Sequence, residues 1–225
     1  MYYGKFPIYV LFENSFCLIF NKPSGLAVQG GKGIKVSLDS ILSEKMNPRP
    51  FLVHRLDRDT SGIILVAKTK EAAALFPKVR AEKRYLAVCA GSLEPSEGLI
   101  DLALDQRESR TSYRILSSGV AAEVSVSLLE LKLGTGRMHQ IRRHLAMKNC
   151  SILGDDKYGD FPLNKSLRKT TGLKHLLLHA SRLVIPPSPG LVPDGLDLSA
   201  PLPEYFSGFL DKSGILNPND LPSQV

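Results

Sequence analysis

The residues best suited to chemistry form one polar run, His54-Arg55-Leu56-Asp57-Arg58-Asp59-Thr60-Ser61-Gly62. The run lies between two apolar segments, 51–53 and 63–67, whose β-branched and aromatic residues predict strands. Functional groups are often placed on a loop held between such rigid elements. Arg55 and Arg58 flank Asp57, and nearby cations favour an ionised carboxyl group, so Asp57 is expected to act as a nucleophile or a base. The alternative is a surface turn whose Asp and Arg side chains only pair in solvent.

Apolar patterning predicts the elements that must position this loop. Two short strands within 8–20 are expected to form a hairpin around Glu13-Asn14-Ser15. The other predicted strands cover 85–90, 110–116, 122–133 and 175–185. Helices are predicted with Ser37 as N-cap, from Thr69 to about Glu82, over 138–148, and from Pro203. Strands dominate without regular βαβ alternation, so the sequence predicts an α+β fold with a mixed sheet.

Individual residues refine these elements. Pro77 is expected to kink or shorten the helix that begins at Thr69. In the helix near 138–148, the side chains expected to face inward are Met138, Ile141 and Leu145. The Pro- and Gly-rich segment 186–203 predicts a loop, and 217–225 predicts a loose tail.

The composition is that of a globular protein with a basic surface. Among 225 residues, 43% are hydrophobic and 23% are charged, and the formal net charge is +7. A basic protein suits a polyanionic partner. Cys17 and Cys89 lie within apolar runs and are expected to be core thiols in a reducing compartment. No apolar run of membrane-spanning length and no signal peptide is apparent, so a cytosolic, soluble protein is expected. It is also expected to be a monomer.

Several further motifs occur in the order in which a known family carries them. They are Asn21-Lys22-Pro23-Ser24-Gly25-Leu26, Lys83-Arg84-Tyr85-Leu86-Ala87, Gly136 to Leu145, Ile152 to Gly159, and Leu177-Leu178-His179-Ala180. Together with the run at 54–62 they resemble the RluA-type pseudouridine synthases over roughly residues 8–210. Met138 departs from that pattern, because the family usually has a small polar residue there.

The resemblance implies an α+β pseudouridine synthase fold. Its sheet is expected to be mixed and largely antiparallel, with flanking helices and a central RNA-binding cleft. It implies one catalytic domain over 8–210, a C-terminal tail over 211–225, and no RNA-binding domain of the S4 type before it. The substrate is expected to be RNA, with 23S ribosomal RNA favoured over transfer RNA, and neither a cofactor nor a metal is implied, since the reaction is an isomerisation.

The resemblance also assigns roles to residues. Asp57 is expected to be the catalytic carboxylate, and Arg142, rather than Arg143, its buried counter-charge. Tyr85 offers a ring to a flipped uracil and a hydroxyl near C5. Leu178 is expected to pack on the other face of the base, and Arg55 to fill the gap that the flipped base leaves. Without the resemblance, these would be an ordinary strand Tyr, a core Leu and surface arginines.

Other functions remain open as alternatives. One is a non-catalytic RNA-binding or RNA-folding protein that keeps the fold. Another is sugar chemistry by Asp57 and Asp59 as an acid–base pair, as in a glycosidase. Two weaker patterns fail: the glycines from Gly25 to Gly33 lack the Lys-Ser or Lys-Thr of a phosphate-binding loop, and the histidine pairs lack a third zinc ligand.

Overall fold

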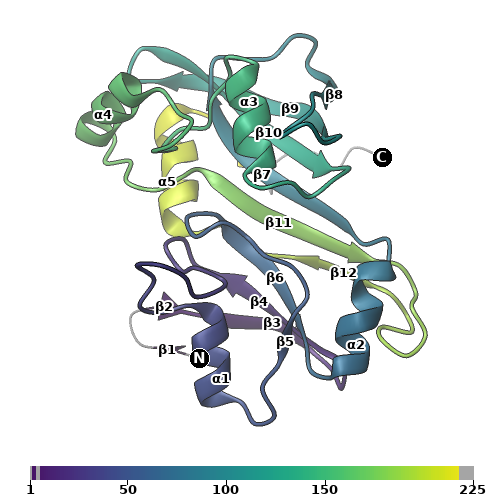
Figure 1. Ribbon diagram of the computed structural model, residues 1–225. Helices are drawn as coiled ribbons and strands as arrows, with labels where there is room; N and C mark the ends of the chain where they lie inside the picture. The colour runs from purple at the N-terminus through teal and green to yellow at the C-terminus, as the bar shows by residue number, and fades with distance from the viewer. Residues whose placement is uncertain (1, 4–5, 218–225) are drawn as a thin grey trace. The chain divides into compact units, whose positions relative to one another are not determined.

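The computed structural model describes residues 2–3 and 6–217 (Figure 1). The chain forms two compact units. The first combines Met1–Lys83 with Ala180–Pro201, and the second combines Arg84–His179 with Leu202–Val225. The chain passes between the units three times: inside the strands β7 (Glu82–Ala90) and β11 (Leu178–Ile185), and between Pro201 and Leu202, outside any strand.

The first unit is built on strands that run side by side in the order β3-β4-β6-β11. β5 pairs with β6 and β12 pairs with β11, both antiparallel. Besides β11, its elements are β1 (Tyr2–Tyr3), β2 (Phe6–Pro7), β3 (Tyr9–Glu13), β4 (Cys17–Lys22), α1 (Leu38–Lys45), β5 (Phe51–Leu52), β6 (Ser61–Ala67), α2 (Lys70–Leu75), the 3-10 helix η1 (Phe76–Lys78) and β12 (Leu196–Ser199).

The predicted hairpin and the predicted helix starts in this unit are confirmed. β3 and β4 pair antiparallel, and the Asn14 side chain forms the turn by accepting hydrogen bonds from the backbone N–H groups of Phe16 and Cys17. Ser37 caps α1 by accepting from Ser40 N at 3.1 Å. Pro77 shortens the next helix as expected, because α2 ends at Leu75 and Pro77 lies in η1.

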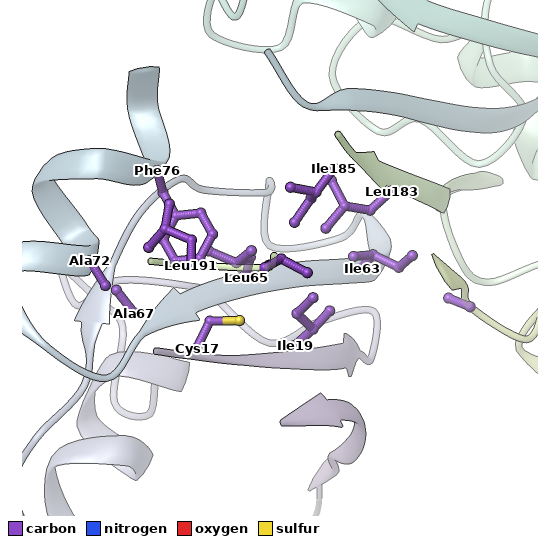
Figure 2. Close-up of a cluster of buried hydrophobic side chains, with 12 residues drawn as sticks. Cys17, Ile19, Ile63, Leu65, Ala67, Ala72, Phe76, Leu183, Ile185 and Leu191 are labelled. Carbon is purple, nitrogen blue, oxygen red and sulfur yellow. The ribbon is translucent and has the colours of Figure 1, made fainter. Parts of the chain in front are cut away.

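A hydrophobic cluster fixes β4, β6 and β11 to one another (Figure 2). Its strand residues alternate in sequence, so they lie on one face of the sheet, where α2 and η1 add side chains. The labelled members are Cys17, Ile19, Ile63, Leu65, Ala67, Ala72, Phe76, Leu183, Ile185 and Leu191. All seven residues of β6 are buried, so this strand is covered on both faces and gives the preceding loop a rigid anchor.

The second unit has four antiparallel strands in the order β7-β10-β9-β8. Apart from β7, its elements are β8 (Glu97–Asp101), β9 (Arg110–Ala121), β10 (Val124–Leu133), α3 (Gln140–Met147), α4 (Phe161–Thr170) and α5 (Glu204–Ser213). β9 and β10 form the long hairpin of Figure 1. The fold class, α+β with a largely antiparallel sheet, is confirmed by these elements.

Helix α5 packs on β9 through a glycine. A Cβ added to Gly119 would lie 2.3 Å from the carbonyl oxygen of Ser213, so the close approach requires glycine there. The predicted helix start at Pro203 is confirmed. The helix continues to Ser213, beyond residue 210, where the catalytic domain was expected to end. Part of the predicted tail, residues 218–225, lies outside the described residues.

One prediction about side-chain burial is wrong. Met138 is 56% exposed, because His139 adopts a left-handed φ of +53° and α3 begins only at Gln140. Met138 therefore precedes the buried stripe that contains Ile141 and Leu145. The prediction of core thiols is confirmed, since Cys17 and Cys89 are buried and free, as is the third cysteine. In the described part of the chain, no helix is long and apolar enough to cross a membrane.

Candidate active site

The polar run that begins at His54 forms the connection between β5 and β6 in the first unit. Residues 53–60 have neither helix nor strand structure, which confirms the loop prediction. Within the loop Leu56 is buried, whereas Arg55 is exposed and Asp57 is half-buried. The buried leucine anchors the loop, while both of its charged neighbours remain at least partly accessible.

The segment around Lys22 holds the backbone of this loop. Lys22 is fully buried, and its Nζ donates to the carbonyl oxygen of Arg58 at 3.0 Å, next to Asp57. Gly25 N donates to the same carbonyl at 2.9 Å, and Ser24 Oγ donates to the carbonyl of Asp59 at 2.8 Å. The motif at 21–26 therefore acts as a clamp on the loop, a role that its sequence alone did not specify.

Burial also changes the chemistry of the Lys22 ammonium group. Burial lowers the pKa of Lys22 to about 7, although the negative charges of Asp59 and Asp57 act in the opposite direction. Two further carbonyls, of Pro23 and Leu26, accept from Nζ at 3.0 and 2.8 Å. Three acceptors match the three N–H groups of a protonated amine, so the hydrogen bonds favour the charged form.

The two ends of the loop are tied to β6 and β11. His54 Nε2 accepts from the backbone N–H of Leu65 at 3.1 Å, which requires an unprotonated Nε2. Burial, with help from the charge of Lys83, lowers the pKa of His54 to about 3. At the other end, Gly62 has φ +109°, and an added Cβ would lie 2.2 Å from the carbonyl oxygen of Ala180. Only glycine fits this position.

Arg58 pairs with its neighbour in the loop. Its Nε and Nη2 donate to the two carboxylate oxygens of Asp59 at 3.1 and 3.2 Å, at the surface. The Asp59 carboxylate therefore binds Arg58 and its carbonyl oxygen binds Ser24, so these contacts give Asp59 a structural role in the loop. The backbone oxygen of Asp57 accepts a turn hydrogen bond from Thr60 N at 3.2 Å.

The second unit carries Tyr85, Leu178 and Arg142. Tyr85 is 6% exposed on β7 and lies opposite Leu131 of β10. Leu178 is the first residue of β11 and is buried. The backbone N–H of Val88 donates to Leu177 O at 3.1 Å, so the start of β11 lies beside β7. Arg55 and Asp57 belong to one unit, and these three residues belong to the other.

Gln140 prepares the start of α3, which carries Arg142. Its Oε1 accepts from Thr135 Oγ1 at 2.8 Å and from Arg137 N at 3.0 Å. Its Nε2 donates to Arg110 O at 2.9 Å and to Thr111 Oγ1 at 3.0 Å. A buried amide with four partners fixes the first turn of the helix to β9.

Arg142 and Arg143 are adjacent but occupy different environments. Arg142 is buried, and its Nε and Nη2 each donate to a carboxylate oxygen of Asp155 at 2.7 Å. Burial alone would raise the pKa of Asp155, but hydrogen bonds from Arg142, Tyr158 and Lys157 outweigh it and hold that pKa below its usual value. Arg143 pairs with exposed Asp105. The expected pairing of Arg142 with Asp57 stays a prediction.

A shallow hollow of about 290 Å³ lies on the opposite side of β7 from Tyr85. It is lined by Arg84, Ser112, Tyr113, Arg114, Glu130 and Lys132. Arg84 and Arg114 both lie near Glu130, at 3.3 and 3.5 Å, so the hollow contains a cross-strand charge ladder. Within residues 2–3 and 6–217, no group of three or more His, Cys, Asp or Glu side chains is arranged to hold a metal ion.

Residues 17–147, from β4 to the end of α3, match the family model of RNA pseudouridylate synthase. The chain belongs to this family. The ribosomal large subunit pseudouridine synthase C of Rickettsia bellii (strain RML369-C) is 35% identical over 222 residues, covering 88% of this chain and 70% of that protein. The enzyme of the same name from Haemophilus influenzae is 37% identical over 189 residues, covering 76% and 58%.

Solved structures agree with the family assignment. The structure of human RNA pseudouridylate synthase domain containing 4 superposes with a TM-score of 0.75 at 27% identity, covering 93% of this chain and 94% of that one. Human RNA pseudouridylate synthase domain containing 1 gives a TM-score of 0.71 at 25% identity, covering 90% and 87%. The predicted family and the predicted enzyme class, an isomerase acting on uridines in RNA, are confirmed.

Sequence reasoning missed three residues whose hydrogen bonds hold the loop around Asp57 or the start of α3. Asp155, Gln140 and Lys22 lie within quoted motifs, yet none was assigned a contact. A charged or amide side chain within an otherwise apolar stretch, such as Lys22 after Cys17–Phe20, was the available signal, since buried polar groups need partners. The partners that mattered most, Asp155 for Arg142 and Arg58 for Lys22, lie 13 and 36 residues away in sequence and needed the fold.

Proposed function

We propose that this pseudouridine synthase modifies uridine in ribosomal RNA of the large subunit, with Asp57 as the catalytic carboxylate. The observation that carries the proposal is the loop around Asp57, whose backbone is clamped by Lys22, Ser24 and Gly25 while the Asp57 side chain stays half-buried. A preorganised carboxylate is what the reaction needs, because fixed geometry removes entropy from the barrier. The names of the bacterial relatives support ribosomal RNA as the substrate.

The reaction breaks the N1–C1′ bond of uridine, rotates the uracil and forms a C5–C1′ bond. In the proposed site, Asp57 attacks the sugar or the base, or removes the 2′ proton. Each of these steps needs an ionised carboxylate. Arg142 pairs with Asp57 and holds it in place.

The remaining predicted residues handle the base. Tyr85 stacks on the flipped uracil and helps the C5 proton to leave, and Leu178 packs on the other face of the ring. Arg55, exposed on the same side of the loop as Asp57, fills the space that the flipped base leaves in the RNA. The protein is proposed to work as a monomer in the cytoplasm, which light scattering and fractionation would test.

The decisive experiment compares Asp57→Asn with Asp59→Asn. The product is measured as hydrogen released from C5 of tritiated uridine and by base-specific mapping of ribosomal and transfer RNA. Asp57→Asn is expected to bind RNA and to form no product, whereas Asp59→Asn should retain turnover. Loss of turnover in both variants would favour an acid–base pair, and turnover in purified Asp57→Asn would refute the assignment. Product in transfer RNA alone would refute the assignment of ribosomal RNA as the substrate.

A further inference from the structure

Arg142 is held rigidly within its own unit by a carboxylate other than Asp57. The Nε and Nη2 atoms form a fork on Asp155, with both distances at 2.7 Å. The side chains are 5% and 1% exposed, so water screens the pair little. The fork occupies one edge of the guanidinium and leaves Nη1 outside it.

Asp155 is itself held by the backbone that follows it. One of its carboxylate oxygens, Oδ1, accepts from the backbone N–H of Lys157 at 2.9 Å and of Tyr158 at 3.0 Å. Its carbonyl oxygen accepts from Asn164 Nδ2 at 3.0 Å, and Asn164 Oδ1 accepts from Gly154 N at 2.9 Å. The carboxylate therefore has little freedom to rotate or withdraw.

The plane of the guanidinium is fixed from a second direction. The Arg142 guanidinium carbon lies 5.2 Å from the centre of the Tyr158 ring, within the range of a cation–π contact. The Tyr158 hydroxyl is 3.0 Å from His139 Nδ1, which orients that ring. Asp155 binds one edge of the Arg142 guanidinium, and the face of the Tyr158 ring lies against the guanidinium group. Together these two contacts determine where the remaining N–H groups of Arg142 point.

We propose that Asp155 is a positioning residue of the reaction: it fixes Arg142 in the orientation in which the guanidinium holds the Asp57 carboxylate. The proposal rests on the proposed function, because it requires Arg142 to pair with Asp57. Asp155 contacts neither the RNA nor the reacting atoms in this account. Its effect passes through Arg142, and it acts on the chemical step rather than on RNA binding.

The test compares Asp155→Asn with Asp156→Asn, a matched change at an exposed neighbour whose Oδ1 is 3.9 Å from Arg142 Nη2. Turnover at saturating RNA and RNA affinity are measured separately. We expect kcat of Asp155→Asn to fall about 10- to 100-fold, as when an outer partner of a catalytic group is lost, with KM within about twofold. Asp156→Asn should behave as the unaltered protein. A folded Asp155→Asn with unaltered kcat would overturn the proposal.

A double-variant cycle separates positioning from a general structural role. If Asp155 acts through Arg142, the double variant Arg142→Met/Asp155→Asn should have the kcat of Arg142→Met alone. Independent, multiplying losses would overturn the proposal. If Asp155→Asn does not fold, Asn164→Ala decides, because it loosens Asp155 and keeps the charge: kcat should fall several-fold at constant RNA affinity, and an unaltered kcat counts against the proposal.

These variants also distinguish a failure of the positioning role of Asp155 from a failure of the proposed function. Product from Asp57→Asn would remove the proposed function itself. Full turnover in Arg142→Met, with none in Asp57→Asn, would leave the function standing and overturn the positioning role. A slow Arg142→Met beside a fully active Asp155→Asn would overturn the role of Asp155 alone.

Discussion

The two adjacent arginines of α3, Arg142 and Arg143, should differ strongly in their contribution to stability, because only the ion pair of Arg142 is buried. Arg142→Ala would strand the buried carboxylate of Asp155, which typically costs about 3–5 kcal/mol. Arg143→Ala removes an exposed pair with Asp105 that contributes about 0–1 kcal/mol. Urea unfolding should therefore show a large loss for the first variant and almost none for the second. The reverse order would mean that the buried pair does not stabilise the unit.

Tyr85 tests whether a buried strand tyrosine is more than packing. Tyr85→Phe keeps the ring that is 6% exposed on β7 and deletes only the hydroxyl. We expect RNA affinity to persist and the late step, in which C5 loses its proton, to slow by about 100-fold. Single-turnover assays with tritiated RNA would measure this step. A variant with full turnover would reduce Tyr85 to a packing role.

His54 makes stability depend on pH in a definite direction. Its pKa is about 3 in the folded protein against an ordinary 6.5, so the unfolded chain takes up the proton first as pH falls. Its contribution is complete above pH 6.5 and is lost progressively as pH falls toward 3. His54→Gln, which keeps an acceptor for Leu65 N, should show a smaller drop in melting temperature between pH 7 and 4.5. An equal drop in both proteins would contradict this prediction.

At the scale of elements, the clamp formed by residues 21–26 connects β4 to the loop around Asp57. Lys22→Met would leave the carbonyls of Pro23 and Leu26 without their Lys22 donor, each at a cost of about 1–3 kcal/mol, while the Arg58 carbonyl would keep its hydrogen bond from Gly25 N. The variant should melt earlier and, where still folded, turn over more slowly with a similar KM. Thermal melts and steady-state kinetics would measure both. Unaltered kcat in a folded variant would show that the loop keeps its shape without the clamp.

Elements with strong local signals were predictable, and those that depend on tertiary contacts were not. Ser37 and Thr69 cap helix starts with their own side chains, so the sequence alone located the starts of α1 and α2. The predicted extent of the second helix to about Glu82 was wrong, because α2 ends at Leu75, Pro77 lies in η1 and Glu82 begins β7. β8 was missed because Glu97–Asp101 is mostly exposed and becomes a strand by pairing with β9. α4 was missed because Leu167 is its only fully buried residue, which leaves no apolar stripe.

At the scale of the whole molecule, the fold class was predictable and the division into two units was not. Linkers rich in Pro, Gly or Ser usually mark a boundary. Here two boundaries fall inside strands, between Lys83 and Arg84 in β7 and between His179 and Ala180 in β11, where no linker composition marks them. The third lies between Pro201 and Leu202, in a Pro-containing segment. Likewise, the sequence motifs identified Asp57 and Arg142 as candidate site residues. They did not predict the ion pair of Arg142 with Asp155, because that pair forms only when α3 packs beside the later turn that carries Asp155.

The net charge of +7 gives the molecule a general attraction for RNA that can be separated from recognition of one uridine. Neutralised phosphates release counterions, so we expect RNA affinity to fall at least about tenfold between 50 and 200 mM salt. Loops and bulges should be favoured, because their bases are easily unstacked. A short stem-loop containing the target uridine should then be a substrate, as filter binding and tritium release would show. If only long ribosomal RNA reacts and salt has little effect, contacts far from the target must supply the recognition.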